Sequence, residues 1–269
     1  MFKSYLEIPT IRLTGVIGHT GMLRSGLNIN NLNKIIEKAF SYKKTPAVAL
    51  SINSPGGSPT QSSYIASKIR TLANKKRKKV IAFVEDVAAS GGYWLACAAD
   101  EIYIDENSIV GSIGVISPGF GFVQMIRKLG IERRVFTSGK SKSFLDPFKE
   151  INQKDVKVIK EIQEIIHKNF IKHVKKSRGK KISSKDSDIF NGLFWVGEKA
   201  VKLGLVDGVG HIEQIIKKKF GEKTRIKIIE QKKSFLQRKV SSSMKNKLFE
   251  MSDLIDSLEE KFYWSRFGL

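Results

Sequence analysis

The chain has 269 residues, 41% of them hydrophobic, and a formal net charge of +22 from 48 Lys and Arg against 26 Asp and Glu. This length suits one sizeable α/β domain, alone or with an appendage, better than two full domains. The single cysteine, Cys97, excludes an intramolecular disulfide and a cysteine-based metal cluster. The positive charge is spread along the chain without a zinc-finger, recognition-helix or aromatic RNA-binding motif, so we expect no nucleic-acid partner.

Hydropathy predicts neither a signal peptide nor a transmembrane helix. Residues 1–15 lack the long apolar stretch of a signal peptide and have the pattern of an opening strand. No uncharged apolar run approaches the ~20 residues needed to span a bilayer. We therefore expect a protein that is cytoplasmic, or peripheral at the inner face of the membrane.

Apolar runs of strand length alternate with segments of helical period, which is the pattern of a mostly parallel sheet covered by helices. The expected strands are residues 11–17, 47–52, 80–84, 102–104, 110–116 and 133–137. The expected helices are residues 31–40, 61–73, 92–99, 155–176 and 198–203. The long fourth helix is expected to end near Gly179.

The composition changes at about Glu230, which predicts a boundary between residues 1–229 and a tail of residues 230–269. The tail begins as a basic linker. It then predicts an amphipathic helix, because apolar residues recur at spacings of three and four: Leu248, Met251, Ile255, Leu258 and Phe262. Acidic residues on its polar face argue against docking on anionic lipid, so packing on this protein or on a second copy is favoured.

Two glycine-containing turns follow expected strands. In Val87-Ala88-Ala89-Ser90-Gly91-Gly92-Tyr93-Trp94, a serine between small residues follows a strand and opens a helical stretch. Backbone N–H groups at such a helix start can stabilise an oxyanion, although a simple helix cap is the commoner role of such a serine. The turn Asn53-Ser54-Pro55-Gly56-Gly57 can bring a second bare N–H close to a substrate carbonyl. Ser90 is therefore a candidate nucleophile.

A nucleophilic serine needs a base, and histidine is badly placed in this chain. The four histidines are at positions 19, 167, 173 and 211, so none lies between residues 20 and 166. The alternative is a lysine made neutral by burial. The segment Thr137-Ser138-Gly139-Lys140-Ser141-Lys142-Ser143 follows the last expected strand and carries two candidates, between which the residues alone do not choose.

Five motifs, taken together and in this order, resemble the bacterial signal peptide peptidase A (protease IV) family of the Clp-protease/crotonase superfamily. They are Asn53 to Gly57, Ala89 to Tyr93, Gly111 to Val115, Ser138-Gly139 with a lysine three positions further on, and Gly204 to Asp207. The resemblance covers about residues 8–229. It implies an α/β fold with a repeated β-β-α superhelix and a mostly parallel sheet, to which this chain adds a C-terminal helical extension.

The resemblance also implies roles for particular residues. Ser90 would be the nucleophile and Lys142 the base, in a Ser-Lys dyad. The backbone amides of Gly57 and Gly91 would form the oxyanion hole, and Ser112 would orient the lysine amine.

The implied activity is that of a serine endopeptidase, with remnant signal peptides or other short or unfolded polypeptides as substrates and with no metal or cofactor. Lys140 is the second candidate for the base. The family also implies a homo-oligomer, in which Lys142 can serve a neighbouring chain. Peripheral membrane contact is a further expectation for this chain. Two alternatives stay open: a crotonase-like acyl-CoA enzyme that uses only the oxyanion hole, and a non-catalytic scaffold subunit.

Overall fold

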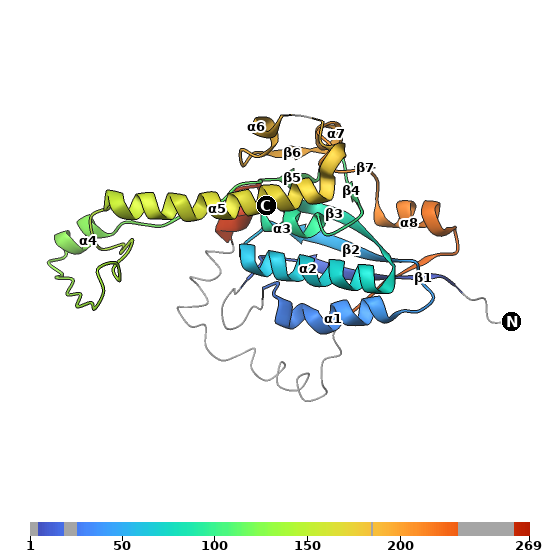
Figure 1. Ribbon diagram of the computed structural model, residues 1–269, viewed down its shortest axis with the longest axis horizontal. Coiled ribbons are helices and arrows are strands. Elements are labelled where there is room, and N and C mark those ends of the chain that lie inside the picture. Colours follow the sequence, from blue (N-terminus) through green and yellow to red (C-terminus); the bar gives the residue numbers. More distant parts are fainter. Residues whose placement is uncertain (1–4, 19–25, 184, 231–260) are drawn as a thin grey trace. The chain divides into compact units, whose positions relative to one another are not determined.

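The structure, a computed structural model, describes residues 5–18, 26–183, 185–230 and 261–269 (Figure 1). Its contacts divide the chain into a larger unit, residues 1–113 with 171–269, and a smaller unit, residues 114–170. The long helix α5 (Gln153–Arg178) begins in the smaller unit, and its residues 171–178 belong to the larger one.

The larger unit is built on an eight-stranded sheet. Its strands are β1 (Glu7–Thr14), β2 (Ala47–Ser54), β3 (Lys79–Ala89), β4 (Glu101–Ile104), β5 (Ile109–Gly111), β6 (Phe194–Val196), β7 (Gly208–Val209) and β8 (Arg225–Ile228). Its helices, besides the end of α5, are α1 (Ile29–Ser41), α2 (Pro59–Lys76), α3 (Gly91–Ala96), α6 (Asp186–Ile189), α7 (Gly197–Lys202) and α8 (Ile212–Phe220), with a 3₁₀ turn at Gly179–Lys181.

The sheet is mostly parallel. Its order is β6-β5-β3-β2-β1-β8, with β4 beside β3 and β7 beside β4. Among the described strands, only the pair β5–β6 is antiparallel. Crossover connections in parallel sheets bring helices onto both faces, and β2 is accordingly buried along nearly its whole length. The predicted α/β class with a mostly parallel sheet is confirmed.

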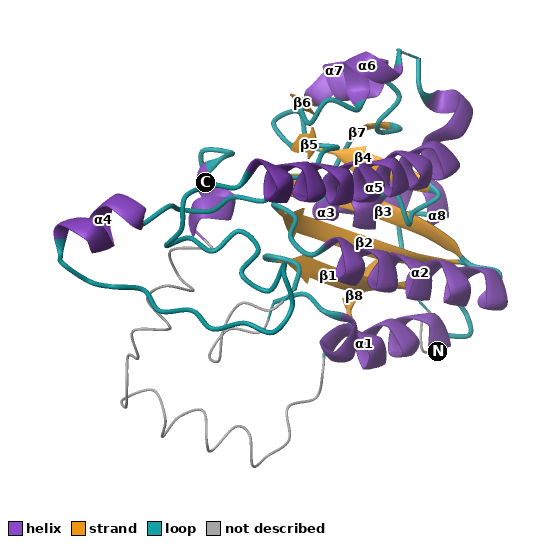
Figure 2. Cartoon of the chain, turned by 60° about the vertical axis from the view of Figure 1, so that its left-hand side comes forward, coloured by secondary structure: helices purple, strands orange, loops and turns teal. Residues whose placement is uncertain are grey.

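Helices cover both faces of this sheet. On one face, Ile216 of α8 packs in a cluster with Ile8 of β1 and Phe83 of β3. Helices α1, α2 and α3 lie together on the other face (Figure 2), where Ile36 of α1 and Ile69 of α2 are fully buried. The core of the larger unit therefore has three layers.

Strand β3 changes its partner part-way along its length. Residues 81–84 pair with β4, whereas residues 87–89 pair with β5. On its other side the register against β2 slips, because Ile52 lies opposite Val84 but Ser54 lies opposite Ala88. Between these two pairs, β3 has more residues than β2. Extra residues in one strand of a pair bend that strand and redirect the side chains that follow. Here the strand leads directly to Ser90.

The smaller unit contains one short helix, α4 (Val123–Lys128), and the first part of α5. Its loops are organised by side chains: Arg133 forms an ion pair with Asp146 at 3.1 Å and lies over the Phe148 ring. The strand predicted at residues 133–137 is wrong, because these residues have no strand partner and Phe136 is 93% exposed. An alternating pattern needs a neighbouring strand before it becomes a sheet.

The other predicted elements had mixed outcomes. The long helix at 155–176 is confirmed, and the structure extends it to Gln153–Arg178. The strand expected at 110–116 is only β5, Ile109–Gly111, after which Ser112 turns the chain. Most of the predicted C-terminal helix lies outside the described residues, although residues 261–265 are helical. Within the part of the chain that the structure describes, no helix is both long enough and apolar enough to cross a bilayer.

Candidate active site

Ser90 sits in a strained turn between β3 and α3. Its backbone angles are φ 51° and ψ −120°, outside the regions that non-glycine residues normally occupy. The turn is fixed at both ends: the Ser90 N–H donates to the Gly111 carbonyl at 2.8 Å, and its own carbonyl accepts from the Trp94 N–H at 3.0 Å. The Ser90 side chain forms no cap hydrogen bond with α3, so the helix-cap role that competed with nucleophile is not observed.

The Gly56–Gly57 turn after β2 packs directly against Ser90. A Cβ atom on Gly56 would lie 2.8 Å from the Ser90 Cβ and 3.0 Å from the Gly91 N, so no side chain fits there. Gly56 also has φ +110° and Gly57 has φ +135°, which L-residues rarely adopt. The glycines are therefore needed both for the fold of this turn and for its approach to the serine.

The backbone N–H groups of Gly57 and Gly91 lie near each other and have no acceptor among the described residues. A Cβ atom on Gly91 would lie 3.4 Å from the Gly57 N. Two backbone hydrogen bonds, each 2.7 Å, join the residues on either side of Gly57 to Ile17: the Ile17 N–H donates to Gly56 O, and the Ser58 N–H donates to Ile17 O. Neither bond uses the Gly57 N–H. Two available donors beside one hydroxyl are what an oxyanion hole requires.

Ser112 directly follows β5, the strand that pairs with the end of β3. Ala89 and Gly111 are register partners in the parallel pair β3–β5, so Ser90 and Ser112 each follow a paired position. Ser112 is buried and also has a positive φ, 52°. Its N–H donates to Leu193 O at 2.7 Å. The structure thus brings together four of the residues that the sequence singled out: Ser90, Gly91, Gly57 and Ser112.

Lys142 lies in the smaller unit, in a run of turns after Gly139. Its N–H donates to Gly139 O at 3.3 Å, and its side chain is exposed, as is that of Lys140. Because Ser90 and Lys142 belong to different units, the dyad stays a prediction.

His173 on α5 contacts α3 through Trp94. Its ring stacks on Trp94 with centroids 4.8 Å apart, and its Nε2 lies 3.0 Å from the Trp94 carbonyl oxygen. Burial lowers the pKa of His173 below the ordinary histidine value, which favours a neutral ring that donates from Nε2 to this carbonyl. The sequence did not reveal this contact, because the position of His173 on α5 gives no sign of its aromatic partner on α3.

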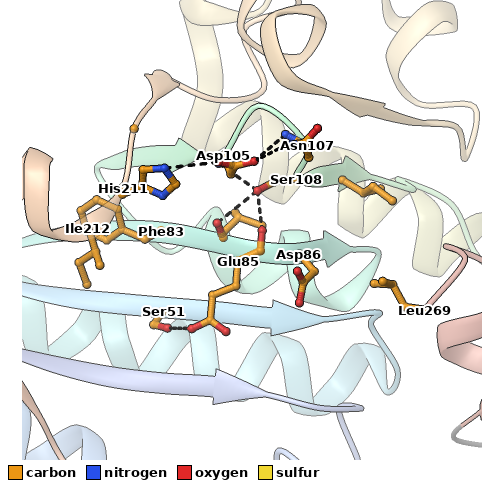
Figure 3. Close-up of a pocket in the computed structure, with 13 residues that line it drawn as sticks. Ser51, Phe83, Glu85, Asp86, Asp105, Asn107, Ser108, His211, Ile212 and Leu269 are labelled. Carbon is orange, nitrogen blue, oxygen red and sulfur yellow. Dashed lines mark hydrogen bonds and ion pairs between the residues drawn. The ribbon is translucent and has the colours of Figure 1, made fainter.

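A cavity of about 510 Å³ lies in the larger unit beside the irregular part of β3 (Figure 3). Three carboxylates line it: Glu85, Asp86 and Asp105. Neither Ser90 nor the two glycine amides are among its lining residues. The cavity therefore adjoins the strand that leads to the serine.

The fold and the site define a class: a parallel α/β domain with a serine in a strained strand-to-helix turn beside two available amides. The family model described as Peptidase family S49 matches residues 72–225, and Protease 4 of Haemophilus influenzae is 31% identical over 196 residues, 70% of this chain and 30% of that protein. The chain belongs to peptidase family S49, and the resemblance found in its motifs is confirmed.

Two further comparisons extend this result. A Brucella abortus protein named Na(+)/H(+) antiporter NhaA is 45% identical over 273 residues, which cover 98% of this chain but only 37% of that protein. The chain thus spans about a third of the length of these two relatives. The solved structure of a mutant of the 1510-N membrane-bound stomatin-specific protease shares the fold, with a TM-score of 0.51 at 15% identity, covering 85% of this chain and all of that one. This is consistent with a Clp-protease/crotonase-like fold.

Proposed function

We propose that this chain is a serine endopeptidase that uses Ser90 as nucleophile and Lys142 as general base. In this proposal the Gly57 and Gly91 amides bind the oxyanion, and Ser112 orients the lysine amine. Membership of peptidase family S49 supports the reaction class. The main support from the structure is the strained Ser90 turn, which packs against the Gly56–Gly57 turn. The backbone N–H groups of Gly57 and Gly91 lie near each other where the two turns meet.

The proposed reaction follows from these groups. Lys142 Nζ, in its neutral form, takes the proton of the Ser90 hydroxyl as Ser90 Oγ forms a bond to the peptide carbonyl carbon. The carbonyl oxygen becomes an oxyanion held by the two amides. The C–N bond then breaks, the leaving amine takes the proton from Lys142, and water hydrolyses the acyl-enzyme.

A neutral lysine needs shelter from water, because desolvation is what disfavours its charged form. The Lys142 side chain is exposed in the single chain. The smaller unit also has large exposed apolar side chains, among them Phe120, Phe136 and Ile165, and extensive exposed apolar surface marks interaction sites. We therefore include a homo-oligomer in the proposal, with a second copy of this chain covering the smaller unit and its lysine.

The proposed substrates are remnant signal peptides or other short or unfolded polypeptides. An extended segment gives access to its backbone carbonyls, which a folded domain does not. Peripheral contact at the inner face of the membrane would bring the site to such peptides. These choices of substrate and location come from the family resemblance, and hydrolysis of defined peptides would test them.

The nucleophile is tested by labelling with a fluorophosphonate probe and locating the adduct by mass spectrometry. We expect an adduct on Ser90, and loss of both the adduct and casein hydrolysis in Ser90→Ala. Ser67→Ala, an exposed serine on α2, is the matched control and should keep both. A folded wild-type protein that gives no adduct would contradict the proposal and favour the acyl-CoA or scaffold alternatives.

A further inference from the structure

We infer that Asn53 and Asp86 form a positioning pair that holds the Gly57 turn in place against the Ser90 turn. The inference rests on the proposed function, because it assigns these residues to the reaction of Ser90. Neither residue contacts the reacting atoms. Both act through the strand ends that carry them.

The pair lies where the sheet is irregular. Asn53 is the β2 residue between Ile52 and Ser54, the two positions between which the register against β3 slips. Asp86 is one of the β3 residues within the slip, after the pairing with β4 ends and before the pairing with β5 begins. A bulged segment leaves ladder groups without their usual partners. Side chains must replace the missing backbone bonds at this point.

Asn53 makes three hydrogen bonds here, two through its side chain and one through its backbone carbonyl. Its Nδ2 donates to Asp86 Oδ2 at 2.6 Å, and its Oδ1 accepts from the Val87 N–H at 3.3 Å. Its backbone carbonyl accepts from the Gly15 N–H, after β1, at 2.9 Å. One residue therefore connects the ends of three neighbouring strands, immediately before the turn that carries Gly57.

The chemistry of the amide explains why asparagine fits this position. Only a side chain with a donor and an acceptor can bond a carboxylate and a backbone N–H at once. The Asp86 carboxylate adds charge to its bond, which makes such bonds shorter and stronger than neutral ones. Aspartate at position 53 could still accept from Val87 but would place a second carboxylate against Asp86.

The irregular segment is also held by Ser51 on β2 and by Ser108 just before β5. Ser51 donates to the Glu85 carboxylate, and the Ser108 hydroxyl donates to the Glu85 carbonyl at 2.5 Å (Figure 3). The slip is therefore a fixed feature, with Asn53 at the end nearest Gly57. Small errors in the placement of reacting groups reduce rates strongly, and this pair sets the offset between the two turns.

The test exchanges the amide and the carboxylate at positions 53 and 86, first singly and then together. The measured quantities are kcat/KM and the rate of fluorophosphonate labelling of Ser90. We expect Asn53→Asp to reduce both by about tenfold or more at neutral pH. Asp86→Asn, which keeps an acceptor for Asn53, should have a smaller effect. The double variant Asn53→Asp with Asp86→Asn restores one amide and one carboxylate, so both rates should return to within a few fold of wild type.

A pH profile separates positioning from a general loss of stability. Two facing carboxylates share a proton as the pH falls, so the activity of Asn53→Asp relative to wild type should rise on acidification. The neighbouring charged or ionisable groups Glu85, Asp105 and His211, and Arg12 on β1, are the same in both proteins, so the substituted carboxylate is the difference that the ratio reports. A purely structural role would change the unfolding temperature but would not produce this pH-dependent ratio.

The outcomes distinguish this inference from the proposed function. If wild-type Ser90 is labelled but the folded Asn53→Asp variant matches it at every pH, the positioning role is overturned. It is equally overturned if the double variant is no better than Asn53→Asp. If wild-type Ser90 is never labelled, the proposed function fails, and this inference fails with it.

Discussion

Arg178 at the end of α5 and Asp207 form a buried ion pair: Arg178 Nη1 lies 2.7 Å from Asp207 Oδ2, and the arginine side chain is 1% exposed. Arg178 Nε also donates to Gly204 O at 2.9 Å, and Asp207 Oδ2 accepts from the Ile102 N–H of β4 at 2.8 Å. The Gly204 to Asp207 motif therefore joins the end of α5 to the sheet, and its role in the fold is structural.

We expect Asp207→Asn to reduce the free energy of unfolding by about 3–5 kcal/mol, because it leaves the Arg178 charge buried without its partner. The measurement is urea unfolding at neutral pH. Glu198→Gln is the control, since Glu198 is 81% exposed in its pair with Lys202 and should contribute about 0–1 kcal/mol. Equal effects of the two substitutions would contradict the structural role of the buried pair.

The same carboxylate predicts acid sensitivity. Burial acts to raise the pKa of Asp207, but hydrogen bonds from Arg178 and Lys181 outweigh it and hold the pKa below the usual value. The stabilisation is therefore fully present above the ordinary aspartate pKa of ~3.9 and is lost as the pH falls through the lower folded-state pKa. Unfolding measured between neutral pH and pH 3 should show a smaller loss of stability in Asp207→Asn than in wild type. If the stability of the two proteins fell equally with pH, the Asp207 carboxylate would not be a source of the acid sensitivity.

Gly56→Ala tests the close packing of the two turns. Its methyl group would lie 2.8 Å from the Ser90 Cβ at a φ of +110°, so one of the turns must move. We expect Ser90 labelling to slow by about tenfold or more in a protein that still folds. Gly119→Ala is the control, because a Cβ atom there meets nothing within 4 Å. Unchanged labelling of the Gly56 variant would show that the turns are less constrained than the structure indicates.

The sequence predicted the regular core well because β2, β3 and α5 have strong local patterns. It failed at residues 133–137, whose alternation is local, whereas pairing depends on a distant strand that is absent there. It missed the short strands β6 to β8 because two to four residues carry too little pattern.

Within the site, composition and spacing identified the Ser90 and Gly57 turns, because both turns are short sequence motifs whose glycines and serine lie close together along the chain. They could not reveal the role of Asn53, which depends on a register slip in β3. Nor could they select Lys142 among so many lysines. That choice came from the family resemblance.

Mixing two inactive variants tests whether Lys142 serves a neighbouring chain. Ser90→Ala lacks the nucleophile and Lys142→Ala lacks the base, so each alone should be inactive in casein hydrolysis. If the lysine acts across an interface, mixed assemblies place the intact Ser90 of one variant beside the intact Lys142 of the other. Random assortment then restores about a quarter of the wild-type activity, and more in a small oligomer once the assemblies of a single variant are removed. The variants are co-expressed with different affinity tags, and isolation through both tags proves that the assemblies are mixed. Lys142→Arg should fail to substitute, since arginine stays protonated. Doubly tagged assemblies without activity would mean that the base acts within its own chain. A Lys142→Ala variant that keeps its activity alone would mean that the base is a different residue, of which Lys140 is the nearest candidate in the same exposed loop.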